Sequence, residues 1–221
     1  MFGHDRFLAR LVQLLGGLSL YGISMAMMVR ANLGLDPWDV LHQGLAPRIG
    51  LSFGLTVNLV GLLVLALWLP LRQRPGLGTV LNILVIGTVT DIALALIPSF
   101  EAYAVRFALL GFGIVLNGIA GGAYIGAGLG PGPRDGLMTG FCRRTGLPVK
   151  LVRTAIELAV LAVGWMLGGT VGLGTLLYAV GIGWVVHHAL PVFTLDRPSR
   201  RPKSNGSRDD SAVGDDSLSS R

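Results

Sequence analysis

The chain has 221 residues, of which 52% are hydrophobic and only 14% are charged. Soluble domains carry about 25% charged residues, so this composition excludes an ordinary soluble protein and indicates a membrane protein. The formal net charge of +6 does not indicate a nucleic-acid partner, because the basic residues lie beside apolar segments and in the tail, as topology signals do. The single cysteine, Cys142, excludes an internal disulfide and a multi-cysteine metal site.

Six apolar segments follow one another, each close to the roughly 20 residues that cross a bilayer core. The first reaches about residue 29 and is too long for a signal-peptide core, so we expect a spanning helix there. The others lie at about 52–71, 77–98, 104–127, 148–168 and 172–194. Residues 196–221 are rich in Arg, Ser, Asp and Gly without an apolar period, which predicts a disordered cytoplasmic tail.

One motif occurs twice, 96 positions apart, and the offset needs no gap from about residue 10 to about residue 94. Its copies are Leu33-Gly34-Leu35-Asp36-Pro37-Trp38-Asp39 and Leu129-Gly130-Pro131-Gly132-Pro133-Arg134-Asp135. We interpret this as an internal duplication, with repeats at residues 1–98 and 99–195. Three spans per repeat place the second repeat upside down relative to the first. The sequence thus predicts an all-α integral membrane fold of six transmembrane helices in two inverted three-helix repeats.

The distribution of positive charge supports this inversion. Arg72 and Arg74 correspond to the uncharged Gly168 and Thr170 in the second repeat. With both termini in the cytoplasm, positive charge lies mainly in the loop of each copy that faces inward, as the positive-inside rule requires. Arg48 fits this topology least well.

A short, non-spanning helix is expected in each repeat, over residues 36–50 and 132–146. Pro37 and Pro133 suit the first helical position, and Asp36 is a good N-cap. The motif residues that begin these helices are Gly34, Asp36, Pro37 and Trp38 in the first repeat and Gly130, Pro133 and Arg134 in the second. A dozen residues of helix rise only about 18 Å, so each helix either lies in the interface or dips into the membrane and returns.

Asp39 and Asp135 are the first candidates for a substrate or ion pathway. Each stands at the third helical position, where a carboxylate bonds back to the cap and is favoured by the helix dipole. Alternatively, both helix ends point toward one central cavity, and the carboxylates bind a cation or move protons. The two interpretations are compatible.

Three further residues are candidates for that pathway. Glu157 lies in the fifth span, where a charge is costly, and it either pairs structurally with Arg153 or acts in proton coupling or substrate binding. Asp91 corresponds to His187, beside His188, which suggests a proton relay. Adjacent histidines on a helix point about 100° apart, so we expect no metal site. With no motif for a catalytic set or a cofactor, we expect no enzyme activity.

The Gly-x-Asp-Pro-Trp-Asp motif after a first span, its Gly-x-Gly-Pro-Arg-Asp copy and the six-span layout resemble the YczE/YyaS/YitT group of bacterial membrane proteins, and within it the YczE-like proteins. The resemblance covers about residues 10–194. It implies a bacterial plasma (inner) membrane location and transfers no catalytic residue onto this chain.

The favoured function is transport of a small solute by alternating access, with the lipid bilayer as surroundings and proton coupling as one option. The alternative is a non-transporting membrane accessory or scaffold protein, which would use its Gly-rich helix faces or its tail. A membrane-embedded enzyme acting on lipid ranks third. Neither the solute nor a homo-oligomer or membrane partner is specified by the sequence.

Overall fold

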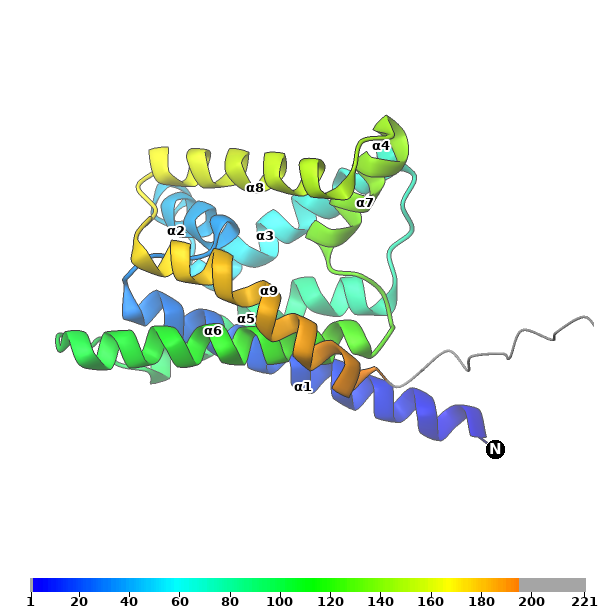
Figure 1. Ribbon diagram of the computed structural model, residues 1–221, viewed down its shortest axis with the longest axis horizontal. Coiled ribbons are helices and arrows are strands. Elements are labelled where there is room, and N and C mark those ends of the chain that lie inside the picture. Colours follow the sequence, from blue (N-terminus) through cyan, green and yellow to red (C-terminus); the bar gives the residue numbers. More distant parts are fainter. Residues whose placement is uncertain (1, 195–221) are drawn as a thin grey trace, which may run out of the picture.

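The computed structural model describes residues 2–194, and all regular secondary structure in that range is helical (Figure 1). The helices are α1 (Phe2–Ala31), α2 (Pro37–Ile49), α3 (Phe53–Ala66), α4 (Trp68–Leu71), α5 (Leu77–Leu96), α6 (Tyr103–Gly126), α7 (Pro133–Thr145), α8 (Val149–Met166) and α9 (Leu173–Phe193). The all-helical prediction is confirmed. The predicted tail, residues 196–221, lies outside the described residues.

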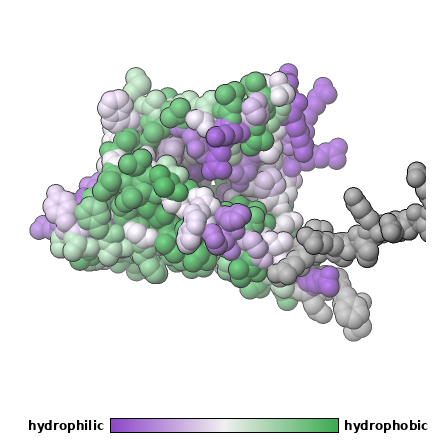
Figure 2. Space-filling model, viewed as in Figure 1, coloured by the Kyte–Doolittle hydropathy of each residue, from purple (hydrophilic) through white to green (hydrophobic). Residues whose placement is uncertain are grey.

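Five helical segments in the described part of the chain are long and apolar enough to cross a membrane. They are α1, α3 with α4, α5, α6 and α9. The multi-pass prediction therefore holds, and Figure 2 shows apolar side chains over much of the visible surface. The α8 helix is not among the five, and its 18 residues include Lys150, Arg153 and Glu157. The sixth span stays a prediction.

The two short helices begin and end as the sequence predicts. Pro37 and Pro133 occupy the first turns of α2 and α7, and Gly50 and Gly146 end them in the left-handed conformation, with φ of 68° and 72°. The offset of 96 also separates the starts of α3 and α8, at Phe53 and Val149, and those of α5 and α9. The helical boundaries thus follow the duplication seen in the sequence.

The α1 and α6 helices cross through two equivalent glycines, Gly17 and Gly113. The residues that an added Cβ would contact are also equivalent: Ala120, Ala123 and Tyr124 for Gly17, and Ser24, Met27 and Met28 for Gly113. Because the start of each helix lies near the end of the other, the two run antiparallel. Reciprocal contacts of this kind relate two helices by a two-fold axis perpendicular to them.

Each motif loop packs on the first turn of a helix from the other half of the chain. The Gly174 N–H donates to the Leu33 carbonyl at 2.7 Å, and the Gly78 N–H donates to the Leu129 carbonyl at 2.8 Å. Gly34 has φ of +113°, and a Cβ there would lie 2.7 Å from the backbone nitrogen of Gly172, the N-cap of α9. Only glycine tolerates this combination of positive φ and close approach.

Equivalent helix contacts are not all equal in the two halves. The α3 helix packs closely on α5, where a Cβ on Gly54 would lie 1.9 Å from the Gly87 carbonyl oxygen. The equivalent helices α8 and α9 hardly touch, and a Cβ on Gly183, the equivalent of Gly87, would meet nothing within 4 Å. The two halves therefore have equivalent helices, but α3 packs on α5 much more closely than α8 packs on α9.

Candidate functional site

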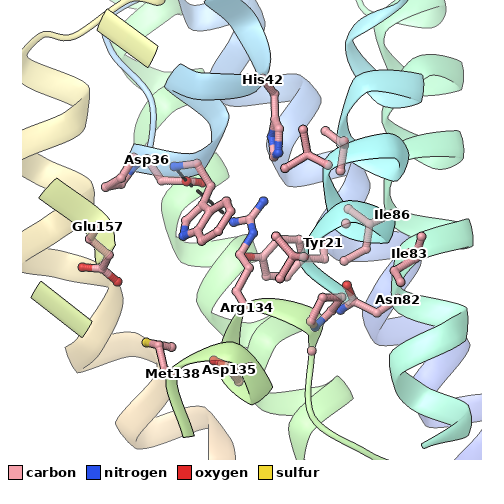
Figure 3. A pocket seen from close by; sticks show the side chains of 18 of the residues that line it. Tyr21, Asp36, His42, Asn82, Ile83, Ile86, Arg134, Asp135, Met138 and Glu157 are labelled. Atoms are coloured by element: carbon pink, nitrogen blue, oxygen red, sulfur yellow. Dashed lines mark hydrogen bonds and ion pairs between the residues drawn. The ribbon is translucent and has the colours of Figure 1, made fainter. Parts of the chain in front are cut away.

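A cavity of ≈ 140 Å³ lies between the two halves, at the N-terminal ends of both short helices (Figure 3). The first turn of α2 contributes Asp36, Pro37 and Trp38. The corresponding part of the second half contributes Gly132, Pro133, Arg134 and Asp135. The cavity is large enough for several water molecules or a small solute. The expectation that both helix ends face one cavity agrees with this placement.

Most cavity residues come as equivalent pairs separated by 96 positions. The pairs are Asp36/Gly132, Pro37/Pro133, Trp38/Arg134, His42/Met138, Val57/Arg153, Gly61/Glu157 and Asn82/Tyr178. A cavity lined in this way lies on the axis that relates α1 to α6. Within these pairs, the second half contributes most of the charge.

Asp36 caps α2. Its Oδ1 accepts hydrogen bonds from the backbone N–H groups of Trp38 at 2.9 Å and Asp39 at 3.1 Å. Its Oδ2 is buried and has no hydrogen-bond partner. Asp36 is only 3% exposed, so one of its carboxylate oxygens is buried without a hydrogen-bond donor.

Asp39 lies directly behind this wall and is fully buried. Its Oδ1 lies 3.1 Å from Nδ1 of His42, and its Oδ2 also lacks a hydrogen-bond partner. The structural interpretation had Asp39 bonding back to the cap, but Asp36 provides the capping bonds instead. This difference leaves the Asp39 carboxylate directed at its neighbours His42 and Arg134.

Arg134 reaches from α7 across the cavity to α2, and Figure 3 shows it between Asp36 and His42 on one side and Asp135 on the other. Its guanidinium lies 4.9 Å from the centre of the Trp38 ring, a cation–π distance. Its nitrogens approach Asp36 to 3.8 Å and Asp39 to 3.9 Å. These separations are ion pairs and are too long for hydrogen bonds. Arg134 thus links the two halves electrostatically.

Burial shifts the pKa values of the titratable groups at α2. It raises the pKa of Asp36 to about 7, reinforced by Asp39 and opposed by Arg134. Burial also raises the pKa of Asp39, again against the effect of Arg134. The pKa of His42 falls to about 3 because of burial and the nearby guanidinium, so its imidazole is neutral near pH 7.

Asp135 and Glu157 line the same cavity from the second half. Asp135 accepts a hydrogen bond from the Tyr124 hydroxyl at 3.1 Å. Glu157 accepts one from Nε of Arg153 at 2.9 Å, so the pair expected from the sequence is present. Glu157 is 35% exposed, and Figure 2 shows polar side chains in the hollow between α8 and α9. The cavity is therefore open on this side.

Asp91 and His187 are placed elsewhere. The Asp91 carboxylate accepts hydrogen bonds from the backbone N–H groups of Gly54 at 2.7 Å and Leu55 at 3.2 Å, and thereby caps α3. His187 is exposed on α9 and packs against the ring of His188. Neither lines the cavity, so the structure does not bring the suggested relay together. Among the described residues, no group of three His, Cys, Asp or Glu could hold a metal ion.

Several cavity residues were not among the site residues expected from the sequence, including His42, Tyr124 and Tyr178. Tyr21 and Asn82 also line the cavity. The duplication carried a usable signal, because Asn82 and Tyr178 are equivalent polar positions inside apolar segments. The position of Tyr124 depends on the crossing of α1 and α6 and has no such signal.

Comparisons with known proteins agree with this membrane architecture. The chain is 41% identical over 179 residues to an uncharacterized protein of Haemophilus influenzae, covering 81% of this chain and 82% of the relative. It is 36% identical over 172 residues to the uncharacterized membrane protein YczE of Bacillus subtilis, covering 77% and 80%. It is 24% identical over 183 residues to YyaS of the same organism, covering 80% and 90%.

No solved structure matches the chain significantly. A protein-family model matches residues 8–190, which is most of the chain. Together with the resemblance to YczE, this match shows that the protein belongs to the membrane-protein family described as "Family of unknown function (DUF6198)".

Proposed function

We propose that the protein transports a small solute across the bacterial plasma membrane by alternating access, using two inverted three-helix repeats with both termini in the cytoplasm. The observation that carries the proposal is a cavity on the axis between the halves, at the N-terminal ends of α2 and α7. Inverted-repeat transporters bind solutes at such an interface, near the middle of the bilayer. The site would bind and release its solute without changing it chemically.

The antiparallel crossing of α1 and α6 supports the inverted arrangement. If α1 crosses the bilayer, the two-fold axis perpendicular to it lies in the membrane plane. A rotation about such an axis exchanges the two sides of the membrane, so it relates one repeat to an inverted copy. The reciprocal contacts of Gly17 and Gly113 are consistent with this geometry.

The unequal helix contacts support alternation. In the present state α3 is closed on α5, whereas the equivalent helices α8 and α9 are apart. If the halves exchange conformations, α8 closes on α9 and α3 leaves α5. The cavity would then lose its opening beside Glu157 and gain one at the equivalent place, beside Gly61. One sequence duplication thereby makes two states accessible.

A crosslinking experiment tests the exchange. Asn58 donates a hydrogen bond to Thr88 at 3.4 Å across the closed contact, and the equivalent residues are Thr154 and Trp184. We expect the Thr154→Cys/Trp184→Cys pair, in a Cys142→Ser background, to crosslink in membranes and to stop transport. Leu158→Cys with Trp184→Cys is the control, because the equivalent of Leu158, Leu62, is exposed. Failure of the first pair to crosslink above the control would contradict the alternation.

A labelling experiment tests the inversion. Leu51 and Leu147 are equivalent, and both are exposed, at 39% and 45%. With single cysteines at these positions in the Cys142→Ser background, a membrane-impermeant maleimide should reach residue 51 only from outside and residue 147 only from inside. Labelling of both from the same side would refute the inverted repeat.

Transport itself is measured with purified protein in liposomes, by the uptake of candidate solutes under imposed solute and proton gradients. Asp135→Asn and Glu157→Gln should reduce uptake, because both carboxylates line the cavity. Glu101→Gln removes a carboxylate outside this cavity and is the matched control. Uptake unaffected by either cavity substitution would exclude these residues from the pathway.

A further inference from the structure

The cavity is surrounded by more acidic than basic groups. Four carboxylates, Asp36, Asp39, Asp135 and Glu157, face two guanidinium groups, Arg134 and Arg153. The nearby imidazole, His42, is buried and adds no positive charge near pH 7. Burial raises the pKa of Asp36 and of Asp39, and a cation beside these carboxyl groups favours their charged form, so the cavity favours positively charged occupants over anionic ones.

In two of these carboxylates, one oxygen has no hydrogen-bond donor. Oδ2 of Asp36 and Oδ2 of Asp39 are buried and have no partner. Nearly all buried polar atoms in folded proteins are hydrogen-bonded, so an unsatisfied one indicates a missing partner. Asp36 lines the cavity, but its Oδ2 is covered in the present state, so a solute can supply the missing donor only if a neighbouring side chain moves aside.

Arg134 stands close to where such a donor belongs without satisfying it. Its guanidinium covers the Trp38 ring at 4.9 Å but stays 3.8 Å from Asp36. We infer that the solute is a small organic cation with N–H donors, of the ammonium or guanidinium type, which takes the place of Arg134 on Trp38 and beside Asp36. This inference rests on the proposed transport function and names its solute class.

The displacement of Arg134 has a consequence for the two halves. Arg134 belongs to the second half, while Trp38, Asp36 and Asp39 belong to the first. A solute that replaces Arg134 therefore breaks the ion pairs that join the halves across the cavity. Binding of the cation would release α7 from α2 and allow the change of state, which is how a solute couples to a conformational equilibrium.

Arg134→Ala tests the inference, because it removes the internal cation and vacates the site. The probes are guanidinium and methylammonium chloride at millimolar concentrations, with sodium chloride at equal ionic strength and sodium acetate as references. Affinity is measured by calorimetry and by thermal unfolding of purified protein in detergent. We expect the probes to bind Arg134→Ala at least about tenfold more tightly than the wild type, from charge-assisted hydrogen bonds and the Trp38 face.

Asp36→Asn in the Arg134→Ala background should remove this gain, whereas Glu101→Gln in the same background should retain it. Absence of a gain over sodium chloride, or preferential binding of acetate, would overturn the inference. If Arg134→Ala is not monodisperse, Arg134→Gln removes the same charge, keeps a polar side chain and is subject to the same outcomes.

Binding and transport are scored separately in these experiments. Cation binding without flux of any tested solute in liposomes would support the cation site and refute the transport function. Flux of a neutral or anionic solute without cation binding would support transport and overturn the inference about the solute class.

Discussion

Gly136 of α7 lies directly against the buried ring of Trp68, and Gly136→Ala should therefore destabilise the protein. A Cβ at residue 136 would lie 1.9 Å from Cζ2 of Trp68, which is 2% exposed. The indole N–H of Trp68 donates to the Pro133 carbonyl at 3.0 Å, at the start of the same short helix. Moving the ring thus disturbs both the packing of α7 and a hydrogen bond beside the cavity.

The magnitude follows from these distances. Carbon atoms pack at about 3.5–4.0 Å, so the ring or α7 must move by roughly 2 Å. Overpacking costs about 1–3 kcal/mol, and a buried N–H that loses its acceptor costs about 1–3 kcal/mol. We expect a loss of about 3 kcal/mol in the free energy of unfolding. Gly111→Ala is the control, because a Cβ there meets nothing within 4 Å, and it should leave stability unchanged or slightly improved.

The equivalent contact in the other half provides a stricter test. In that contact the large and small side chains are exchanged, because Val40 corresponds to Gly136 and Gly164 corresponds to Trp68. A Cβ on Gly164 would lie 2.7 Å from the Val40 carbonyl carbon. Trp68→Gly alone should cost about 3–5 kcal/mol through a cavity, and Gly136→Val alone should clash. The double variant recreates the exchanged pair, so its loss should be smaller than the sum of the single losses by about 2 kcal/mol.

The assay is thermal unfolding in detergent, followed by the monodisperse fraction on size-exclusion chromatography across a temperature series. Purely additive losses in the double variant would refute the argument that the two contacts are equivalent. An unchanged unfolding temperature for Gly136→Ala would refute the estimate of close packing against Trp68.

Three further predictions concern charged groups. Asp91→Asn should cost about 1–2 kcal/mol of unfolding free energy by weakening the cap of α3, measured by the same thermal assay, and equal stability would argue against the cap. Glu157→Gln should change stability by less than about 1 kcal/mol, because its pair with Arg153 is half-exposed, while liposome uptake should fall; equal uptake would leave the pair purely structural. Because Asp36 has a raised pKa of about 7, its folded state holds a proton that the unfolded state has lost, and this contribution to stability falls as pH rises from about 4 to about 7. His42, whose pKa is lowered to about 3, contributes in the opposite direction up to about pH 6.5. Asp36→Asn should therefore make stability increase more with pH over this range than in the wild type, and an identical pH dependence would exclude the contribution of Asp36.

The sequence predicted the elements of the fold well, because their signals are local. Pro37 and Gly50 mark the start and end of α2 whatever surrounds them, and the offset of 96 transfers the same boundaries to α7. The role of Asp91 was missed for the opposite reason. Its partners Gly54 and Leu55 are more than 35 positions away, and no short-range pattern connects a residue near the end of α5 with the first turn of α3.

The site shows the same division between local and distant signals. Asp39 and Asp135 occupy the same position of the repeated motif, so the motif alone predicts the same role for both. Their surroundings differ because Trp38 of the first copy is replaced by Arg134 in the second, and these two side chains meet across the axis. A duplication predicts which positions are equivalent. It does not predict that the side chains of Trp38 and Arg134 contact each other, because this contact depends on how the two halves cross.

This difference between equivalents bears on the balance of states in the proposed transport cycle. Two identical halves would make the present state and its exchanged counterpart equal in free energy. Here the second half carries Arg134, Arg153 and Glu157 where the first carries Trp38, Val57 and Gly61. In the present state Glu157 and Arg153 stand at the open side, where both side chains are partly exposed. Closing α8 on α9 would bury that pair, and burying ions costs free energy that their mutual attraction only partly offsets. The resting protein should therefore favour the state seen here, and a bound cation near Glu157 would offset part of that cost.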